Sequence, residues 1–227
     1  MRLYRGIAVP ESKANEAVAV IEGNGLLVGG RFWSGLAVHD LKMRLEPLWD
    51  EPGLSLKLTR PNSAEPLARV CACVRARDAL YYACSHNRKG EDTTPILITF
   101  DADPDDVVID GRDFLYTVIQ LGNATLSRKA LERVFGTAVL RYADRAWASA
   151  DQQVRIACAD LAVQDPDVIG AHAANELVLG GRYRTRFSSA FMVRAPVPKE
   201  RIASVERVDH RAYVLPDIDV ALEQLLP

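Results

Sequence analysis

The chain has 227 residues, 48% of them hydrophobic and 26% charged, and its formal net charge at pH 7 is −2. This composition is typical of a soluble globular protein. The longest apolar runs, PILITF and AVAVI, are far shorter than the roughly 20 residues that cross a bilayer, and the start MRLYRGIAVPES lacks the apolar stretch of a secretory signal. We therefore expect a cytoplasmic protein with no membrane partner, and any nucleic-acid contact must come from a local basic patch.

Four cysteines, Cys71, Cys73, Cys84 and Cys158, are expected to be reduced thiols, because a chain of this length does not need disulfides to stabilise its core. The Cys71-x-Cys73 pair has no second cysteine pair or histidine at the spacing of a zinc site. The pattern therefore predicts no metal.

The amino-terminal part predicts a strand, a helix and a loop. Residues 3–9 are partly β-branched and stop at Pro10, which favours a strand. A helix follows, capped by Ser12 and ended by Gly23-Asn24-Gly25. The next segment is a glycine-rich loop over residues 25–35. After it we expect a short helix over residues 39–48 and a strand around residues 54–58, where leucines alternate with polar residues.

The middle of the chain predicts a strand in ARVCACV, a helix from there to Gly90, and a buried strand in PILITF. Residues 101–122 are expected to form a loop, a strand and a short helix. An apolar stripe then predicts one long helix over residues 125–147, which Gly136 weakens only slightly. Two more helices are expected at residues 152–162 and at about 167–174.

Near the end, ELVLGG and RFSSAFMV predict two strands joined by the turn RYRTR. A strand-poor tail containing RIASVERV and an amphipathic segment around residues 218–226 complete the chain. The order of elements favours a single α+β domain over residues 1–227, with a helical insertion at about residues 125–175.

Three of these segments carry a specific pattern. LYRGI places Arg5 directly before Gly6, VCACVRARDALYYA combines a strand of small residues with a helix, and RFSSAFMVRAPVP is a late strand with a proline-containing exit. In order and spacing they resemble the nicotinamide-binding strands of the mono-ADP-ribosyltransferase family, in its Arg-Ser-Glu-like toxin and effector branch. Cys71, Ala72 and Cys73 stand where that family has Ser-Thr-Ser.

This resemblance implies a split antiparallel β-sandwich with flanking helices, and NAD as a substrate bound between its two sheets. Arg5 would hold a phosphate or ribose oxygen with its fork of donors. The strand at Cys71 to Cys73 would shape the pocket, and Phe32, Trp33 or Tyr81 would form a wall against the cationic nicotinamide ring. The NAD-binding residues so implied are Arg5, Gly6, Arg31, Phe32, Trp33, Cys71, Cys73 and Tyr81.

The family's catalytic glutamate falls on Ala190. In that chemistry the bond to nicotinamide breaks through an oxocarbenium-like state, which a carboxylate stabilises. An alanine side chain cannot do this. Three explanations are open: an inactivated variant of an active enzyme, which the intact flanking residues favour, a natural pseudoenzyme, or a carboxylate elsewhere, such as Glu176.

The acceptor side of the resemblance lies in the turn before Ala190. Ser188 replaces a glutamate that helps select arginine acceptors in this family, and the turn mixes cations with an aromatic face, as single-stranded nucleic acid requires. We therefore expect transfer of ADP-ribose to a base of RNA or DNA. The acceptor-binding residues so implied are Arg182, Tyr183, Arg184, Arg186 and Ser188.

Other interpretations remain. The same fold would also suit a protein acceptor, with RYRTR as a docking surface for an acidic partner. A different class is a non-catalytic nucleotide-binding module, which a natural alanine at position 190 would favour. Similarity to toxin members of the family also implies a neutralising antitoxin or immunity protein.

Overall fold

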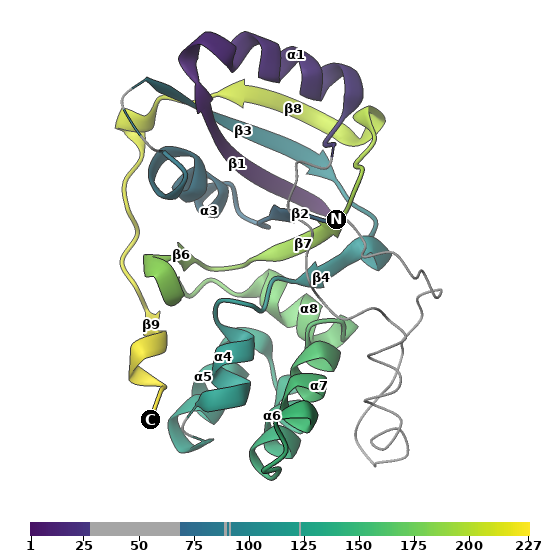
Figure 1. The fold of residues 1–227 in the computed structure, drawn as a ribbon, viewed down its shortest axis with the longest axis vertical. Coiled ribbons are helices and arrows are strands. Elements are labelled where there is room, and N and C mark those ends of the chain that lie inside the picture. Colours follow the sequence, from purple (N-terminus) through teal and green to yellow (C-terminus); the bar gives the residue numbers. More distant parts are fainter. Residues whose placement is uncertain (28–68, 89, 91, 123) are drawn as a thin grey trace.

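The computed structural model describes residues 1–27, 69–88, 90, 92–122 and 124–227. It is a mixed α+β structure whose described part contains seven α-helices and three small sheets (Figure 1). The expected α+β class is therefore confirmed. The glycine-rich loop, the helix expected at 39–48 and the strand expected near 54–58 lie largely or wholly outside the described residues.

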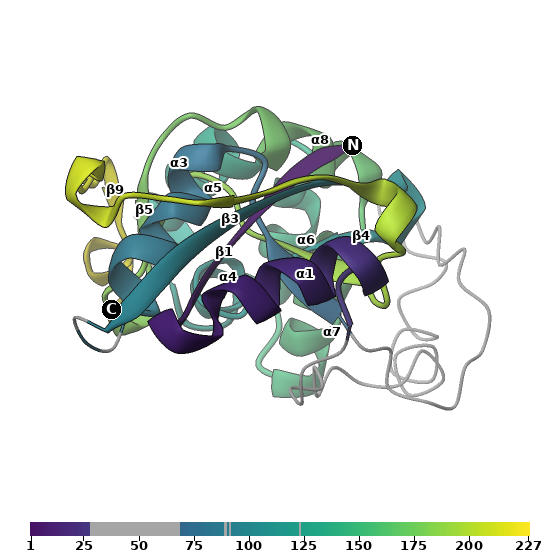
Figure 2. The same cartoon turned by 90° about the horizontal axis from the view of Figure 1, so that it is seen from above.

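The first sheet has the order β1-β3-β8 and is antiparallel throughout. Its strands are β1 (Arg2–Pro10), β3 (Thr93–Asp101) and β8 (Ile202–Arg207). Helix α1 (Ala14–Asn24) packs along β8, and α3 (Ala76–Tyr81) packs beneath β1, so this sheet is covered by helices (Figures 1 and 2). The isoleucines of PILITF, Ile96 and Ile98, have no exposed surface, as the continuous apolar run predicts.

The second sheet has the order β2-β7-β4 and is also antiparallel. It consists of β2 (Arg69–Ala72), β7 (Phe191–Arg194) and β4 (Val107–Ile109). A single bridge between Tyr4 and Cys73 joins β1 to the end of β2. The two sheets therefore meet where LYRGI lies beside the Cys71–Cys73 segment.

A third, very short sheet lies near the carboxyl end, in the order β6-β5-β9. Strand β5 (Leu179–Gly180) runs antiparallel to β6 (Arg186–Phe187) and parallel to β9 (Val220–Ala221). The turn RYRTR connects β5 to β6 through a single 3₁₀ turn, Arg182–Arg184.

Five helices lie on the far side of the second sheet (Figure 1). They are α4 (Leu115–Leu121), α5 (Ala124–Phe135), α6 (Val139–Trp147), α7 (Gln152–Ala162) and α8 (Pro166–Ala174). Their buried side chains, including Phe135 and Tyr142, form one continuous apolar cluster with those of the strands, including Phe100 and Phe191. The helical segment expected at about 125–175 is present, and it begins earlier, at Leu115.

Several local predictions are confirmed. Helix α7 has the bounds that its sequence pattern predicts, and Asp151 caps it by accepting a hydrogen bond from the Gln153 amide. Helix α1 ends at Gly25, whose φ of 78° lies in the left-handed region. Ser12 does not cap that helix, because a 3₁₀ turn, Glu11–Lys13, precedes it and Lys13 occupies the cap position.

The single long helix predicted over residues 125–147 is wrong. The chain forms α5 and α6, which are separated at Gly136 with a φ of 76°. A Cβ atom at this position would lie 2.7 Å from the Ala171 Cβ of α8. The helix breaks because α8 packs closely against a backbone that only glycine adopts readily, and no local pattern reveals that contact.

Two predictions about the last third of the chain also need correction. RIASVERV is not strand-poor, because Ile202–Arg207 forms the edge strand β8 of the first sheet. RFSSAFMV is not one strand, because Ser188–Ala190 leave the third sheet after β6 and enter the second sheet at β7. Finally, no helix in the described ranges is long and apolar enough to cross a membrane.

Candidate functional site

Arg5 lies at the junction of the two sheets. Its guanidinium Nη1 donates a hydrogen bond of 2.7 Å to the backbone carbonyl of Cys71 on β2. The neighbouring Gly6 allows β1 to pass directly over α3, since a Cβ atom there would lie 1.8 Å from the Ala79 carbonyl oxygen. Gly6 is therefore required for packing on α3, and this packing sets where Arg5 emerges.

Cys71 brings two further charged residues to Arg5. Its thiol lies 3.6 Å from Asp110 Oδ2 and 3.7 Å from Arg112 Nη2, and the Arg112 guanidinium holds Asp110 through two bonds of 2.8 and 2.6 Å. We call Arg5, Cys71, Asp110 and Arg112 the Arg5 cluster. Desolvation, followed by the charge of Asp110, raises the pKa of the Cys71 thiol, so this thiol is neutral at physiological pH.

Tyr82, in the π-helical turn Tyr82–His86 after α3, belongs to the same region. Desolvation raises the pKa of its hydroxyl, and the next contributions come from Cys73, Asp110 and Asp113. Tyr81 is the tyrosine that the resemblance implies as a wall of the NAD pocket. It is 4% exposed, and its hydroxyl donates to the Arg184 carbonyl at 2.8 Å, so it is a core residue that anchors the RYRTR turn.

The segment Ser188–Ala190 is held by buried polar groups. Asp78 Oδ2 accepts from the Ser188 hydroxyl at 2.6 Å and from the Ser189 amide at 3.1 Å. Asn175 donates to the Ser188 carbonyl at 2.7 Å. Ser188 and Ser189 have no exposed surface, so the Ser188 side chain contributes to this network and does not face an acceptor in this structure.

Ala190 has both of its backbone groups occupied. Its N–H donates to His172 Nε2 at 3.1 Å, and its carbonyl accepts from the Asp110 amide at 2.8 Å. Burial lowers the pKa of His172 to about 3, so the ring is neutral and its Nε2 can accept this bond. The backbone of Ala190 is thus one hydrogen bond away from the Arg5 cluster.

The RYRTR turn lies next to the loop that carries Asp110 and Arg112. Asp113, at the end of this loop, accepts a hydrogen bond from the Thr185 hydroxyl. Arg182 and Arg184 are exposed, and Arg184 has a φ of 59°. Arg186 is half-buried and donates to the Pro216 carbonyl at 2.6 Å. The turn therefore presents two exposed cations and contacts Asp113, which directly follows Arg112 of the Arg5 cluster.

The structure brings together Arg5, Cys71, Cys73 and the backbone of Ala190. Glu176 is 81% exposed and pairs with Arg75 at 3.2 Å, apart from these contacts. Arg31, Phe32 and Trp33 lie outside the described residues. The sequence analysis missed Asp110 and Arg112. The signal was the polar segment DGRD directly after β4, which was interpreted only as a turn.

All four cysteines are free thiols. Over the described ranges, no group of three or more His, Cys, Asp and Glu side chains is arranged to hold a metal ion. No protein-family model matches the chain, and neither the curated proteins nor the solved structures give a significant match.

Proposed function

We propose that this chain is an ADP-ribosyltransferase-like toxin or effector domain that binds NAD at the Arg5 cluster, and that its activity is disabled by alanine at position 190. One observation carries the proposal. Arg5 contacts Cys71, Cys71 contacts Asp110, and Asp110 contacts the carbonyl of Ala190, although these residues come from four distant parts of the sequence.

The charges of the cluster suit a dinucleotide. Arg5 donates to the carbonyl of Cys71 and Arg112 Nη2 lies 3.7 Å from its thiol, so two guanidiniums lie close to this one residue. Guanidinium groups bind phosphate oxygens through paired N–H donors. We infer that they hold the pyrophosphate of NAD, while the aromatic ring of Tyr82, in place of the buried Tyr81, provides the wall against the nicotinamide ring.

The chemistry then requires a carboxylate beside the nicotinamide ribose. The glycosidic bond breaks, nicotinamide leaves with the bonding electrons, and a nucleophilic atom of the acceptor attacks the ribose carbon and loses its proton. Alanine cannot stabilise the positive charge that develops on the ribose. Loss of one such group commonly lowers the rate by about a hundredfold or more, so we expect Ala190→Glu to restore activity.

A second candidate for the carboxylate is Asp110, because its amide is bonded to the Ala190 carbonyl. Both of its side-chain oxygens are engaged by Arg112, at 2.8 and 2.6 Å. We therefore assign Asp110 to orienting Arg112, and the experiment below includes a variant that distinguishes the two roles.

For the acceptor we propose a nucleic-acid base, because the exposed Arg182 and Arg184 lie close to the cluster. The turn is also rigidly attached, through the Tyr81 hydroxyl and the Thr185–Asp113 contact. A protein acceptor, or nucleotide binding without turnover, are the alternatives. As a toxin-like domain it would have a neutralising protein partner.

The test begins with NAD binding to the unmodified chain, measured by calorimetry. Arg5→Gln should weaken binding at least tenfold, whereas Arg128→Gln, in an exposed ion pair with Asp144 on α5 and α6, should leave it unchanged. Equal binding by both variants would refute the assignment of NAD to the Arg5 cluster.

Turnover is then measured with NAD labelled in its adenosine part. Ala190→Glu should release nicotinamide at least a hundredfold faster than the unmodified chain, and the label should appear on RNA or DNA. Label on protein supports the second acceptor class, and binding without turnover in every variant supports a pseudoenzyme. If the unmodified chain already cleaves NAD and Asp110→Asn abolishes this, Asp110 is the carboxylate.

A further inference from the structure

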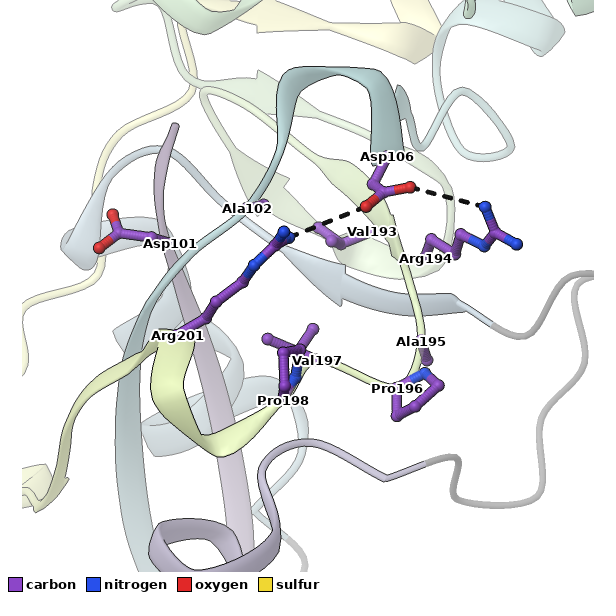
Figure 3. A pocket seen from close by; sticks show the side chains of 10 residues that line it. All are labelled: Asp101, Ala102, Asp106, Val193, Arg194, Ala195, Pro196, Val197, Pro198 and Arg201. Atoms are coloured by element: carbon purple, nitrogen blue, oxygen red, sulfur yellow. Dashed lines mark ion pairs between the residues drawn. The ribbon is translucent and has the colours of Figure 1, made fainter. Parts of the chain in front are cut away.

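Figure 3 shows a cavity of about 240 Å³ beside the last residues of β7, Val193 and Arg194. Ala190 precedes the other end of this strand. Arg194, at the end of β7, is four residues beyond Ala190, which in a strand corresponds to roughly 13 Å. Much of the wall of the cavity is apolar and comes from β7 and the segment that follows it, including Val193, Pro196 and Val197. This cavity is distinct from the Arg5 cluster.

The rim of the cavity carries an excess of positive charge. Asp106 lies between Arg194 and Arg201, whose guanidiniums approach its two carboxylate oxygens from opposite sides (Figure 3). Arg69, paired with Arg194 in the strand register, donates to the Asp106 carbonyl at 3.4 Å. Asp101, the other carboxylate of the lining, is neutralised by Arg2 through bonds of 2.7 and 3.0 Å. Arg194 and Arg201 thus share the one carboxylate of Asp106.

The ion pairs of Asp106 are too long to be hydrogen bonds. The distances are 3.9 Å to Arg194 and 3.8 Å to Arg201, whereas a charge-assisted bond between these groups measures about 2.7–2.9 Å. The two side chains are 50% and 42% exposed, so ordering them costs conformational entropy that these loose pairs do not offset. An anion with several oxygens would satisfy both forks at once.

We propose that this cavity binds the phosphate of a phosphomonoester, with Arg194 and Arg201 as its ligands and the proline and valine wall against the sugar or other carbon part. The volume of the cavity is sufficient for a phosphate with an attached pentose. The phosphate would come from a small sugar phosphate or from the 5′ end of a nucleic-acid strand.

The test measures the binding of ribose 5-phosphate in two ways, by calorimetry and by the change in the NMR shifts of the Val193 and Val197 methyl groups. Arg201→Gln should weaken binding about 10- to 100-fold, since it removes a charged donor. Arg128→Gln, which makes the same change of charge on a distant helix, should have no effect. Asp106→Asn should strengthen binding about tenfold, because a like charge is removed from within a few Å of the phosphate.

Two comparisons complete the experiment. RNA with and without a 5′ phosphate, measured beside ribose 5-phosphate, identifies the source of the group. Arg5→Gln should leave phosphate binding in this cavity intact while weakening NAD binding at the Arg5 cluster, so the two proposals can fail separately. Our inference is overturned if neither phosphorylated probe shifts the two methyl groups at millimolar concentration, if sulfate binds as tightly as ribose 5-phosphate, or if Asp106→Asn weakens binding.

Discussion

The buried carboxylate of Asp78 holds the segment that leads to Ala190, and its removal should therefore destabilise the fold strongly. Asp78 is 2% exposed, and a single oxygen, Oδ2, accepts from both the Ser188 hydroxyl and the Ser189 amide. Asp78→Ala leaves these two buried donors without an acceptor. Each unsatisfied donor costs about 1–3 kcal/mol, so we expect a loss of about 2–6 kcal/mol.

Asp78→Asn is the matched variant. Because both bonds end on one oxygen, an asparagine carbonyl placed there can accept both, and burial already raises the pKa of the Asp78 carboxyl by disfavouring its charge. We expect Asn to cost less than about 1.5 kcal/mol.

The free energy of unfolding is measured by urea denaturation at pH 7, with Asp144→Ala as the control. Asp144 forms an exposed ion pair with Arg128, so its loss should cost at most about 1 kcal/mol. If Asp78→Ala costs no more than Asp144→Ala, or if Asn is as damaging as Ala, the role of this oxygen is refuted.

Further predictions concern packing and pH. Gly6→Ala should destabilise the fold by at least about 3 kcal/mol, because the added Cβ meets a backbone oxygen at 1.8 Å. Gly23→Ala in helix α1 should stabilise it by up to about 1 kcal/mol, because nothing lies within 4 Å of the added Cβ. Urea midpoints that fall equally in both variants would contradict this. Gly136→Ala should cost about 1–3 kcal/mol of stability, because of its left-handed φ and the contact of the added Cβ with Ala171 at 2.7 Å. Gly170→Ala in helix α8 should not destabilise the fold, because no atom lies within 4 Å of the added Cβ. Thermal melts of the two variants test this difference. Burial lowers the pKa of His172 to about 3 in the folded chain, whereas the same ring in the unfolded chain takes up a proton at about pH 6.5. The free energy of unfolding should therefore fall as the pH drops from 6.5 towards 3, by up to about 1.4 kcal/mol per pH unit. A His172→Gln variant with the same slope of stability against pH would show that His172 is not the cause.

The local pattern was sufficient for elements whose own residues decide their structure. Helix α7 has an aspartate cap at its start, and β3 is a continuous apolar run that stays buried wherever it packs. The left-handed glycine after α1 was predictable for the same reason, since glycine tolerates that backbone in any context.

Tertiary contacts decided what the local pattern could not. Gly136 breaks a helix because α8 lies against it, and β8 forms a strand because β3 offers an open edge. In the sequence, Asp110 and Arg112 belong to a polar segment that is typical of a surface turn. The fold places them beside Cys71, about 40 residues away in the sequence. The burial of Ser188 depends on Asp78, which is 110 residues away. A sequence pattern records only the preferences of neighbouring residues, whereas these positions take their roles from hydrogen bonds and packing between segments that meet only in the folded chain.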